Sequence, residues 1–409
     1  MRGTDPAAPP RDSAPWARRA GAALLPVLLV AAFLLRAGGL FHPRYYHPDL
    51  RSHADMVTIV SEAGLDFWAH PSKYIAEQGV WTQGALGETY AFPFSPLFHA
   101  FFVPFHLDFF SLIDAMKLVA CLLSALEVFI VFSLGRRLGG VETGIWGAAL
   151  TVFSPAALSR LSWAFLAAVF AHLLDTLVLA SLFPKPERQR PRYWLAAAFL
   201  FFALAAYPGS LVNFGIFFPI LGGLLIIRTG PELRRIGLKL LAIAAGVALV
   251  VLAIVYREFL GVFLTELLPG FFAGGSRGGS FSPVQAIVTL VTRYWIFFGA
   301  FYLPFVVGGI VLWLRRRPDP LASRLLLAWG TTFVVLIFLR SAAPDLFNKV
   351  KEILWVAPLI ALAGGRVLDW ARSSLPRGRW ITAAYYALVA SYGVVFYARA
   401  IAEKFELAR

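Results

Sequence analysis

Cysteine is nearly absent from this sequence, and charged residues are scarce. Cys121 is the only cysteine among 409 residues, so neither a disulfide framework nor a cysteine-ligated metal site can form within one chain. Charged residues make up 15% of the chain, hydrophobic residues make up 59%, and the mean hydropathy is +0.71. This balance excludes an ordinary soluble domain and predicts a polytopic membrane protein.

Acidic residues are also few, which leaves a formal net charge of +14. In a soluble protein this charge would suggest a nucleic-acid partner. Here the Lys and Arg residues lie mainly in short connections between apolar runs. They therefore indicate membrane topology and contact with anionic lipid, and no nucleic-acid partner is predicted.

Long apolar runs dominate the chain. A membrane-spanning helix needs roughly 20 apolar residues, which predicts about eleven spans in one all-α transmembrane helical bundle. Their centres lie near residues 30, 124, 150, 173, 200, 219, 247, 304, 332, 361 and 390. Residues 1–19, rich in Pro and Ala, are predicted to be a disordered cytoplasmic N-terminus. Residues 20–409 are predicted to form a single domain, whose first apolar run is too long for a signal peptide.

The connections between spans alternate in charge, which predicts their sides. Basic connections, such as those at Arg136 and Arg137 and at Arg315 to Arg317, should be cytoplasmic. Two long connections, residues 41–110 and 258–293, then face outside. The short apolar stretch at 96–110 is expected to be an interfacial or re-entrant helix within the first of them.

The first external loop concentrates the polar chemistry of the chain. Its first part, from Phe41 to about Phe94, holds four of the seven histidines and several carboxylates: His42, His47, His53, His70, Asp49, Asp55, Glu62 and Asp66. Ordering so long a loop costs backbone entropy that contacts must recover. We therefore interpret it as the catalytic loop of a membrane enzyme.

Three segments carry a family resemblance. The order of a first span, a long outer loop with an early Asp, the segment YAFPFSPLF, a span ending in GRRLGG and a following SPAALSR resembles the GT-C superfamily of polyprenyl-phosphate-sugar-dependent glycosyltransferases. It is similar to bacterial membrane mannosyl- and aminoarabinosyl-transferases. The resemblance implies a multi-pass enzyme of the bacterial inner (plasma) membrane with its active site facing outside. Its partners would be a polyprenyl-phosphate sugar donor and a glycan, lipid or protein acceptor.

The resemblance also implies a catalytic acid early in the first outer loop. Either Asp49 or Asp55 can take that position. A helix that starts near Pro48 advances by about 100° per residue, so Asp55 would point about 120° away from Asp49. His53 lies one turn after Asp49, and Glu62 lies two turns after Asp55. The candidate substrate contacts are His53, Glu62, Tyr74 and His99.

The leaving phosphate needs cationic or N–H partners, or a divalent metal such as Mg²⁺ or Mn²⁺. The candidate phosphate-binding residues are Arg340, Lys349 and Arg277. Arg340 and Lys349 can equally be interface residues, and the glycine-rich loop around Arg277 can equally be a lid. The loop histidines fit no standard zinc spacing, so no metal ligand set is assigned.

The predicted reaction is an inverting transfer of a sugar, with mannose as the first candidate. A lipid or sugar transporter and a noncatalytic assembly scaffold are the alternatives, although no internal repeat typical of transporters is visible. Within the membrane, Glu127, His172 and Asp175 are predicted to turn inward and pair as structural groups. After SPAALSR the chain reads LSWAFLAA, without the second acid that relatives often carry there.

Overall fold

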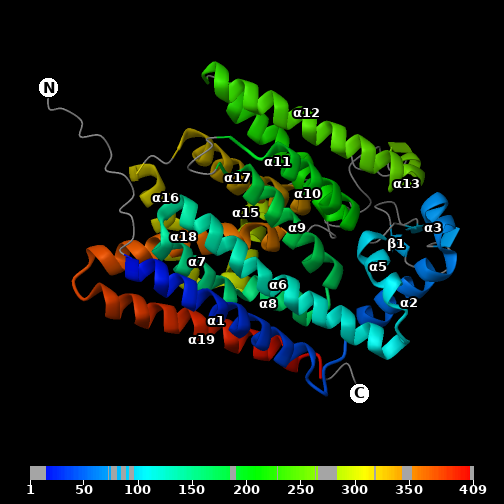
Figure 1. Ribbon diagram of the computed structural model, residues 1–409, viewed down its shortest axis with the longest axis horizontal. Helices are drawn as coiled ribbons and strands as arrows, with labels where there is room; N and C mark the ends of the chain where they lie inside the picture. Colours follow the sequence, from blue (N-terminus) through cyan, green and yellow to red (C-terminus); the bar gives the residue numbers. More distant parts are fainter. Residues whose placement is uncertain are drawn as a thin grey trace.

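The protein is a bundle of long helices with a group of short elements at one end (Figure 1). The computed structural model describes residues 15–71, 73–74, 81–83, 89–91, 96–184, 190–227, 229–262, 264–265, 283–316, 319–342 and 352–405. Within these ranges the chain is helical apart from turns and one short hairpin, so the predicted all-α class is confirmed. The first helix begins at Pro15, inside the segment that was predicted to be disordered.

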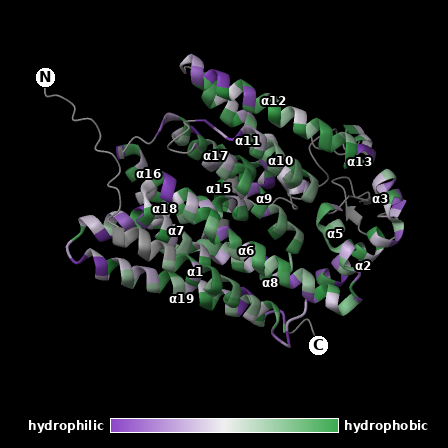
Figure 2. Cartoon of the chain, in the orientation of Figure 1, coloured by the Kyte–Doolittle hydropathy of each residue, from purple (hydrophilic) through white to green (hydrophobic). Residues whose placement is uncertain are grey.

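Twelve helices form the long part of the bundle among the described residues. They are α1 Pro15–Leu40, α6 Phe109–Gly139, α7 Val141–Val152, α8 Pro155–Ser162, α9 Leu166–Leu182, α10 Tyr193–Ala206, α11 Pro208–Ile226, α12 Pro231–Ile254, α16 Leu303–Arg316, α17 Pro320–Ala342, α18 Glu352–Ser374 and α19 Gly378–Ala402. Hydrophobic residues cover most of their surface, and hydrophilic residues gather at helix ends and around α3 (Figure 2). This distribution suits a bundle surrounded by lipid.

Small residues allow the central helices to pack closely. A Cβ on Gly135 of α6 would lie 2.8 Å from the Cα of Gly144 on α7. A Cβ on Gly365 of α18 would lie 2.5 Å from the carbonyl oxygen of Thr143 on α7. Membrane helices associate through such close contacts, because lipid provides no hydrophobic drive for their association. Helix α7 is therefore held between α6 and α18.

The predicted count of about eleven spans is not confirmed. Seven helices among the described residues are long and apolar enough to cross a membrane, or eight if α15 Pro283–Phe298 and the following α16 form one broken span. These spans make the chain a multi-pass membrane protein. Helices also occur at the predicted centres 150, 173 and 200, but they are only 12, 17 and 14 residues long. Apolar runs overestimated the spans because turns at Phe153 and Tyr207 end helices without ending the hydrophobicity.

The first predicted external loop forms the compact end of the molecule. It contains α2 Pro48–Ala63, α3 Leu65–Ala69, the strands β1 Trp81–Gln83 and β2 Thr89–Ala91, α5 Pro96–Phe102 and the 3-10 helix η1 Val103–Phe105. The two strands pair antiparallel, a small departure from an all-helical chain. Helix α5 and η1 together are too short to cross a membrane, as expected.

The second predicted external loop is described at its two ends. Helix α13 covers Arg257–Val262, and α15 already begins at Pro283, ten residues before the predicted end of the loop at residue 293. Helix α13 lies beside α3 in Figure 1. Arg257 donates a hydrogen bond to the carbonyl oxygen of Ala69, and His70 Nδ1 lies 3.4 Å from Glu258 Oε1. The two segments that were predicted to be external therefore contact each other.

The C-terminal helix brings the end of the chain to the same side as α2. Helix α19 runs beside α1 (Figure 1), and Tyr397 Oη donates to the carbonyl oxygen of Arg36 at 2.9 Å. The ring of Phe405 stacks on His42 at 4.5 Å between centroids. Residues from the two ends of the sequence therefore meet at the start of α2.

Candidate functional site

The site is built around the first turn of α2. Pro48 starts this helix with a preset φ, and His47 caps it, its Nδ1 accepting a hydrogen bond from the Asp49 N–H at 3.3 Å. Asp49 lies in the first turn, where the helix dipole favours a carboxylate. Its side chain is 46% exposed, so it can reach a substrate.

A buried tyrosine fixes the connection from α1 to α2. Tyr45 is 7% exposed, and its hydroxyl donates to the carbonyl oxygens of Leu161 at 3.3 Å and Ser162 at 3.0 Å. These carbonyls belong to the last turn of α8. The start of α2 is thereby tied to the junction between α8 and α9.

Two buried cations occupy this junction. The Lys404 Nζ lies 4.3 Å from the centre of the Trp163 ring, and the Arg160 guanidinium lies 5.5 Å and 5.2 Å from the rings of Phe165 and Phe297. Lys404 and Arg160 are 9% and 8% exposed. Aromatic faces stabilise cations that have lost much of their water.

The backbone turns sharply beside these cations. Ala164 has a φ of +50°, and its N–H bonds to the carbonyl oxygen of Leu161 at 2.9 Å. A non-glycine residue in this left-handed region costs about 1–3 kcal/mol and is found most often at functional sites. Trp163, just before it, is 46% exposed. The turn thus presents an aromatic face beside buried positive charge.

Lys404 comes close to the start of α2, because the next residue, Phe405, stacks on His42 at 4.5 Å between ring centroids. Burial lowers the pKa of the His47 imidazole, the Asp49 carboxyl opposes this shift, and the Lys404 ammonium adds to it. A neutral His47 matches its role as the acceptor from the Asp49 N–H. The arrangement offers a carboxylate that can take a proton, cations that can balance an anion, and an aromatic surface that can contact a sugar ring.

Asp55 and Glu62 lie elsewhere on α2. Both are exposed, whereas the buried face of the helix includes Leu50, His53 and Val57. Helix α2 is regular from Pro48, as the angular argument assumed, so Asp55 points about 120° away from Asp49. The structure therefore does not bring the two candidate acids together. Catalysis by Asp55 and substrate binding by Glu62 remain predictions.

His53 and His99 form a buried pair. Their Nδ1 and Nε2 atoms lie 3.0 Å apart, and the two residues are 4% and 0% exposed. The ring of Phe98 packs against both. This pair joins α2 to α5 in the interior of the group of short elements at one end of the bundle. Substrate binding by either histidine remains a prediction, and the packing gives each a structural role.

Acidification should weaken this pair. Burial lowers the pKa of His53 to about 4, with His47 adding to the shift, and burial lowers the pKa of His99 well below its usual value. Unfolded histidines bind protons near pH 6.5, so the folded state binds fewer protons between about pH 6.5 and 4. Stability is therefore complete above about pH 6.5 and falls as the pH is lowered, by up to about 1.4 kcal/mol per pH unit for each histidine.

Thermal unfolding of the protein in lipid between pH 7.5 and 5 tests this prediction. His53→Gln should flatten the decrease in Tm at acidic pH. His106→Gln is the matched control, because His106 is an exposed histidine directly after η1, in the same group of short elements. Equal pH slopes for the wild type and His53→Gln would contradict the assignment.

The other predicted residues have separate positions. Tyr74 donates its hydroxyl hydrogen to the Asp66 carboxylate. Both residues come after α2 in the sequence, so this bond does not involve the first turn of α2. Arg340 lies half-buried in the last turn of α17. Arg277 and Lys349 lie outside the described residues. The phosphate-binding and substrate-binding roles of these residues remain predictions.

The described residues offer no preformed set of several metal ligands. They contain no group of three or more His, Cys, Asp or Glu side chains that could hold a metal ion. Beside Asp49, His47 uses its Nδ1 for the helix cap. We therefore assign no step to a metal.

Sequence reasoning missed the two cations. Arg160 stood in the SPAALSR segment, which entered only as part of the family resemblance. Lys404 stood in the C-terminal tail, which carried no motif. Its aromatic partner, Trp163, is distant in the sequence, so no local pattern pointed to this contact.

Comparisons with known proteins identify the fold. No protein-family description and no curated protein matches the chain. Solved structures do match it. One is the archaeal oligosaccharyltransferase AglB from Archaeoglobus fulgidus in complex with an inhibitory peptide and a dolichol-phosphate, with a TM-score of 0.58 and 11% identity over 96% of this chain and 56% of that chain.

Two further structures of the Archaeoglobus fulgidus oligosaccharyltransferase give the same result. Its apo form matches with a TM-score of 0.58 and 13% identity over 94% of this chain and 56% of that chain. The form tethered to an acceptor peptide with the NVT sequon matches with a TM-score of 0.58 and 13% identity over 95% and 55%. The chain thus spans about half the length of these proteins. The likeness establishes that the chain shares the fold of these structures.

Proposed function

We propose that this chain, which shares its fold with a membrane oligosaccharyltransferase, is a glycosyltransferase that takes a sugar from a polyprenyl-phosphate-linked donor. The acceptor is a hydroxyl of a glycan, lipid or protein at the external face of a bacterial inner (plasma) membrane. Asp49 is the general base. The observation that carries the proposal is the half-exposed Asp49 at the start of α2, beside a junction that holds two buried cations.

The neighbouring structures support the choice of substrates. One of them is a complex with a dolichol-phosphate and an inhibitory peptide, and another carries a tethered acceptor peptide. Dolichol-phosphate is a polyprenol-type phosphate, and the proposal carries this donor class to the present chain. The seven or eight spans place the protein in a membrane, where the lipid tail of a polyprenyl-phosphate donor would also lie.

Asp49 performs the proton transfer in the proposed mechanism. Its carboxylate accepts the proton of the acceptor hydroxyl while the hydroxyl oxygen forms a bond to the anomeric carbon. The bond from the anomeric carbon to the phosphate oxygen breaks on the opposite face, and polyprenyl phosphate leaves with the electron pair. Attack from the opposite face inverts the anomeric configuration.

Lys404 and Arg160 balance the charge of the leaving phosphate. Both are nearly buried, so their interaction with an anion is screened less than at an exposed surface. Trp163 offers a partly exposed ring face to the sugar. Mannose is the first sugar to test, because of the resemblance of the sequence to mannosyltransferases.

The test is transfer of radiolabelled sugar by the purified full chain in lipid nanodiscs. Synthetic polyprenyl-phosphate donors are offered with lipid, glycan and peptide acceptors, and product configuration is read by NMR. Transfer with inversion is expected. Retained configuration would contradict the single-displacement mechanism. Movement of donor lipid or sugar across a vesicle membrane, without any transfer, would favour a transporter instead.

A further inference from the structure

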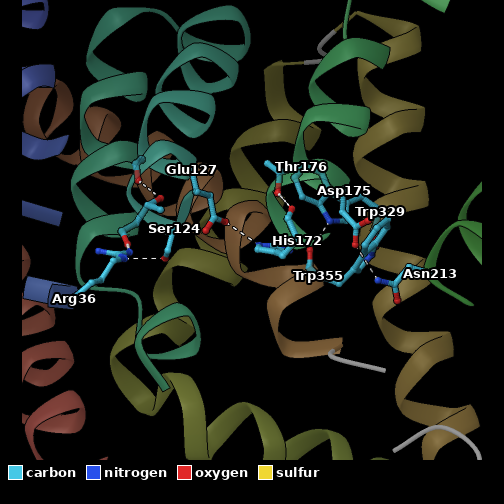
Figure 3. Close-up of polar contacts among 11 residues, drawn as sticks. Arg36, Ser124, Glu127, His172, Asp175, Thr176, Asn213, Trp329 and Trp355 are labelled. Atoms are coloured by element: carbon cyan, nitrogen blue, oxygen red, sulfur yellow. Dashed lines mark hydrogen bonds and ion pairs between the residues drawn. The ribbon is translucent and has the colours of Figure 1, made fainter. Parts of the chain in front are cut away.

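A row of polar side chains crosses the interior of the bundle, separate from the candidate site. It consists of Arg36 from α1, Ser124 and Glu127 from α6, His172 and Asp175 from α9, and Asn213 from α11, as Figure 3 shows. Its members are 0%, 4%, 3%, 7%, 4% and 6% exposed in that order. We call these six residues the polar row.

Hydrogen bonds and one ion pair connect the polar row. Arg36 Nε donates to Ser124 Oγ at 2.8 Å, and its other nitrogens donate to backbone carbonyls. His172 Nε2 lies 2.9 Å from Glu127 Oε1. Asn213 Nδ2 donates to Asp175 Oδ2 at 3.3 Å. The sequence predicted that Glu127, His172 and Asp175 would pair, and the structure adds Arg36 and Asn213 to them.

Charge neutrality requires one more proton in the polar row. A buried ion costs several kcal/mol unless an opposite charge compensates it. The guanidinium of Arg36 compensates one carboxylate, but Glu127 and Asp175 provide two. His172 contacts Glu127 and lies three residues before Asp175 on the same helix, so it stands between the two acids.

We propose that His172 binds one proton and is held as an imidazolium between Glu127 and Asp175. The polar row then alternates in charge from Arg36 to Asp175 and has no net charge. Asp175 Oδ1 makes no hydrogen bond with any described residue, and attraction to His172 adds to the hydrogen bond that Asn213 donates to Oδ2.

No other described group around His172 supplies this charge. Helices α8 and α18 contribute the apolar Ala157 and Leu354 to the wall beside it. The cation of α8, Arg160, lies over Phe165 and Phe297 instead. Helix α10 has Tyr193 as its only ionisable residue, at its first position, and α11 has none.

A small cavity lies at the centre of the polar row. It has a volume of about 10 Å³ and is lined in part by Ser124, Glu127 and His172. This is room for about one water molecule, with three polar partners at hand. A water there would stabilise the charged pair further.

The polar row fixes α9 to its neighbours on both sides. Glu127 ties His172 to α6, and Asn213 ties Asp175 to α11. Helix α9 follows directly after the turn that carries Trp163 and Ala164. The bound proton therefore helps to hold the position of that turn, and His172 is a positioning residue.

Charge-balanced variants of the full chain in nanodiscs test the proposal. His172→Gln leaves two carboxylates and one guanidinium, so its Tm should fall by about 5 °C or more. The double variants His172→Gln/Glu127→Gln and His172→Gln/Asp175→Asn restore neutrality and should regain at least half of the loss. His172→Gln/Thr176→Val is the control, because Thr176 is a buried neutral neighbour on α9 and should restore nothing.

Nitrogen-15 NMR of the wild-type histidines at pH 7 gives a second readout, which does not depend on variant folding. Two protonated ring nitrogens on His172 are expected. A neutral His172 would overturn the proposal, as would double variants that lose as much Tm as the sum of their single losses. Stabilisation of the wild type, but not of Asp175→Asn, by sodium over choline salts would also overturn it, since a cation would then balance Asp175.

Discussion

Replacing Asp49 with Asn should reduce the rate of sugar transfer by about 10²–10⁴-fold, the range for loss of a general base. Asn has the size and shape of Asp but cannot accept the proton of the acceptor hydroxyl. The side chain is 46% exposed, so loss of its favourable interaction with the helix dipole costs only about 0.3–1 kcal/mol. The loss should therefore appear in kcat, with KM for the donor and Tm nearly unchanged.

Asp55→Asn is the matched control for this prediction. It removes the same charge from the same helix, at an exposed position that points about 120° away. Single-turnover transfer in nanodiscs should proceed at nearly the wild-type rate in this variant. A loss in Asp55→Asn that equals or exceeds the loss in Asp49→Asn would assign the base to Asp55 and contradict the site.

The pH dependence of the wild type gives an independent check on the base. A carboxylate base must be ionised to act, so the transfer rate should fall at acidic pH. The His53–His99 pair loses stability in an overlapping acidic range, so the profile is compared with that of His53→Gln. If the transfer rate falls at acidic pH in both proteins, while Tm falls less in His53→Gln than in the wild type, the loss of rate comes from protonation of the base and not from unfolding.

The sequence predicted the architecture of this molecule well, for a physical reason. Hydropathy over long windows decides whether a helix lies in lipid, and the helices at all eleven predicted centres exist. Their lengths were not predictable in the same way. At Tyr207 and Pro208 the chain remains apolar while proline prevents continuation of α10, so one apolar run becomes two helices.

The candidate site was predicted in part. Asp49 was recognisable, because the family resemblance implied an acid early in the first outer loop, although Asp55 fitted that position as well. Lys404 and Arg160 were not, since they come from segments distant from α2 in the sequence and reach it only through the packing of α19 on α1 and of Tyr45 on α8. His53 and His99 were recognised in the sequence as candidate substrate contacts. The sequence did not show that the amphipathic face of α2 buries His53.

Replacing Arg160 with Gln should slow sugar transfer by about 10²–10³-fold, the range for loss of one group that stabilises developing negative charge. The phosphate gains charge as the glycosidic bond breaks, so the cation acts mainly in the transition state and the loss should appear in kcat. Lys404→Gln should act in the same direction. Arg160→Lys retains the charge and should recover part of the rate.

A structural role for Arg160 predicts a different pattern, which the controls can detect. Arg324 is the matched control, since it is likewise an arginine of a bundle helix, but it lies on α17, where its Nε donates to the carbonyl oxygen of Leu224 at 2.9 Å. Arg324→Gln should leave kcat unchanged. If Arg160 only packs between Phe165 and Phe297, Arg160→Gln will lower Tm and kcat together, and Arg160→Lys will restore neither. Recovery of kcat by Arg160→Lys at an unchanged Tm therefore requires a cation that faces the reacting phosphate.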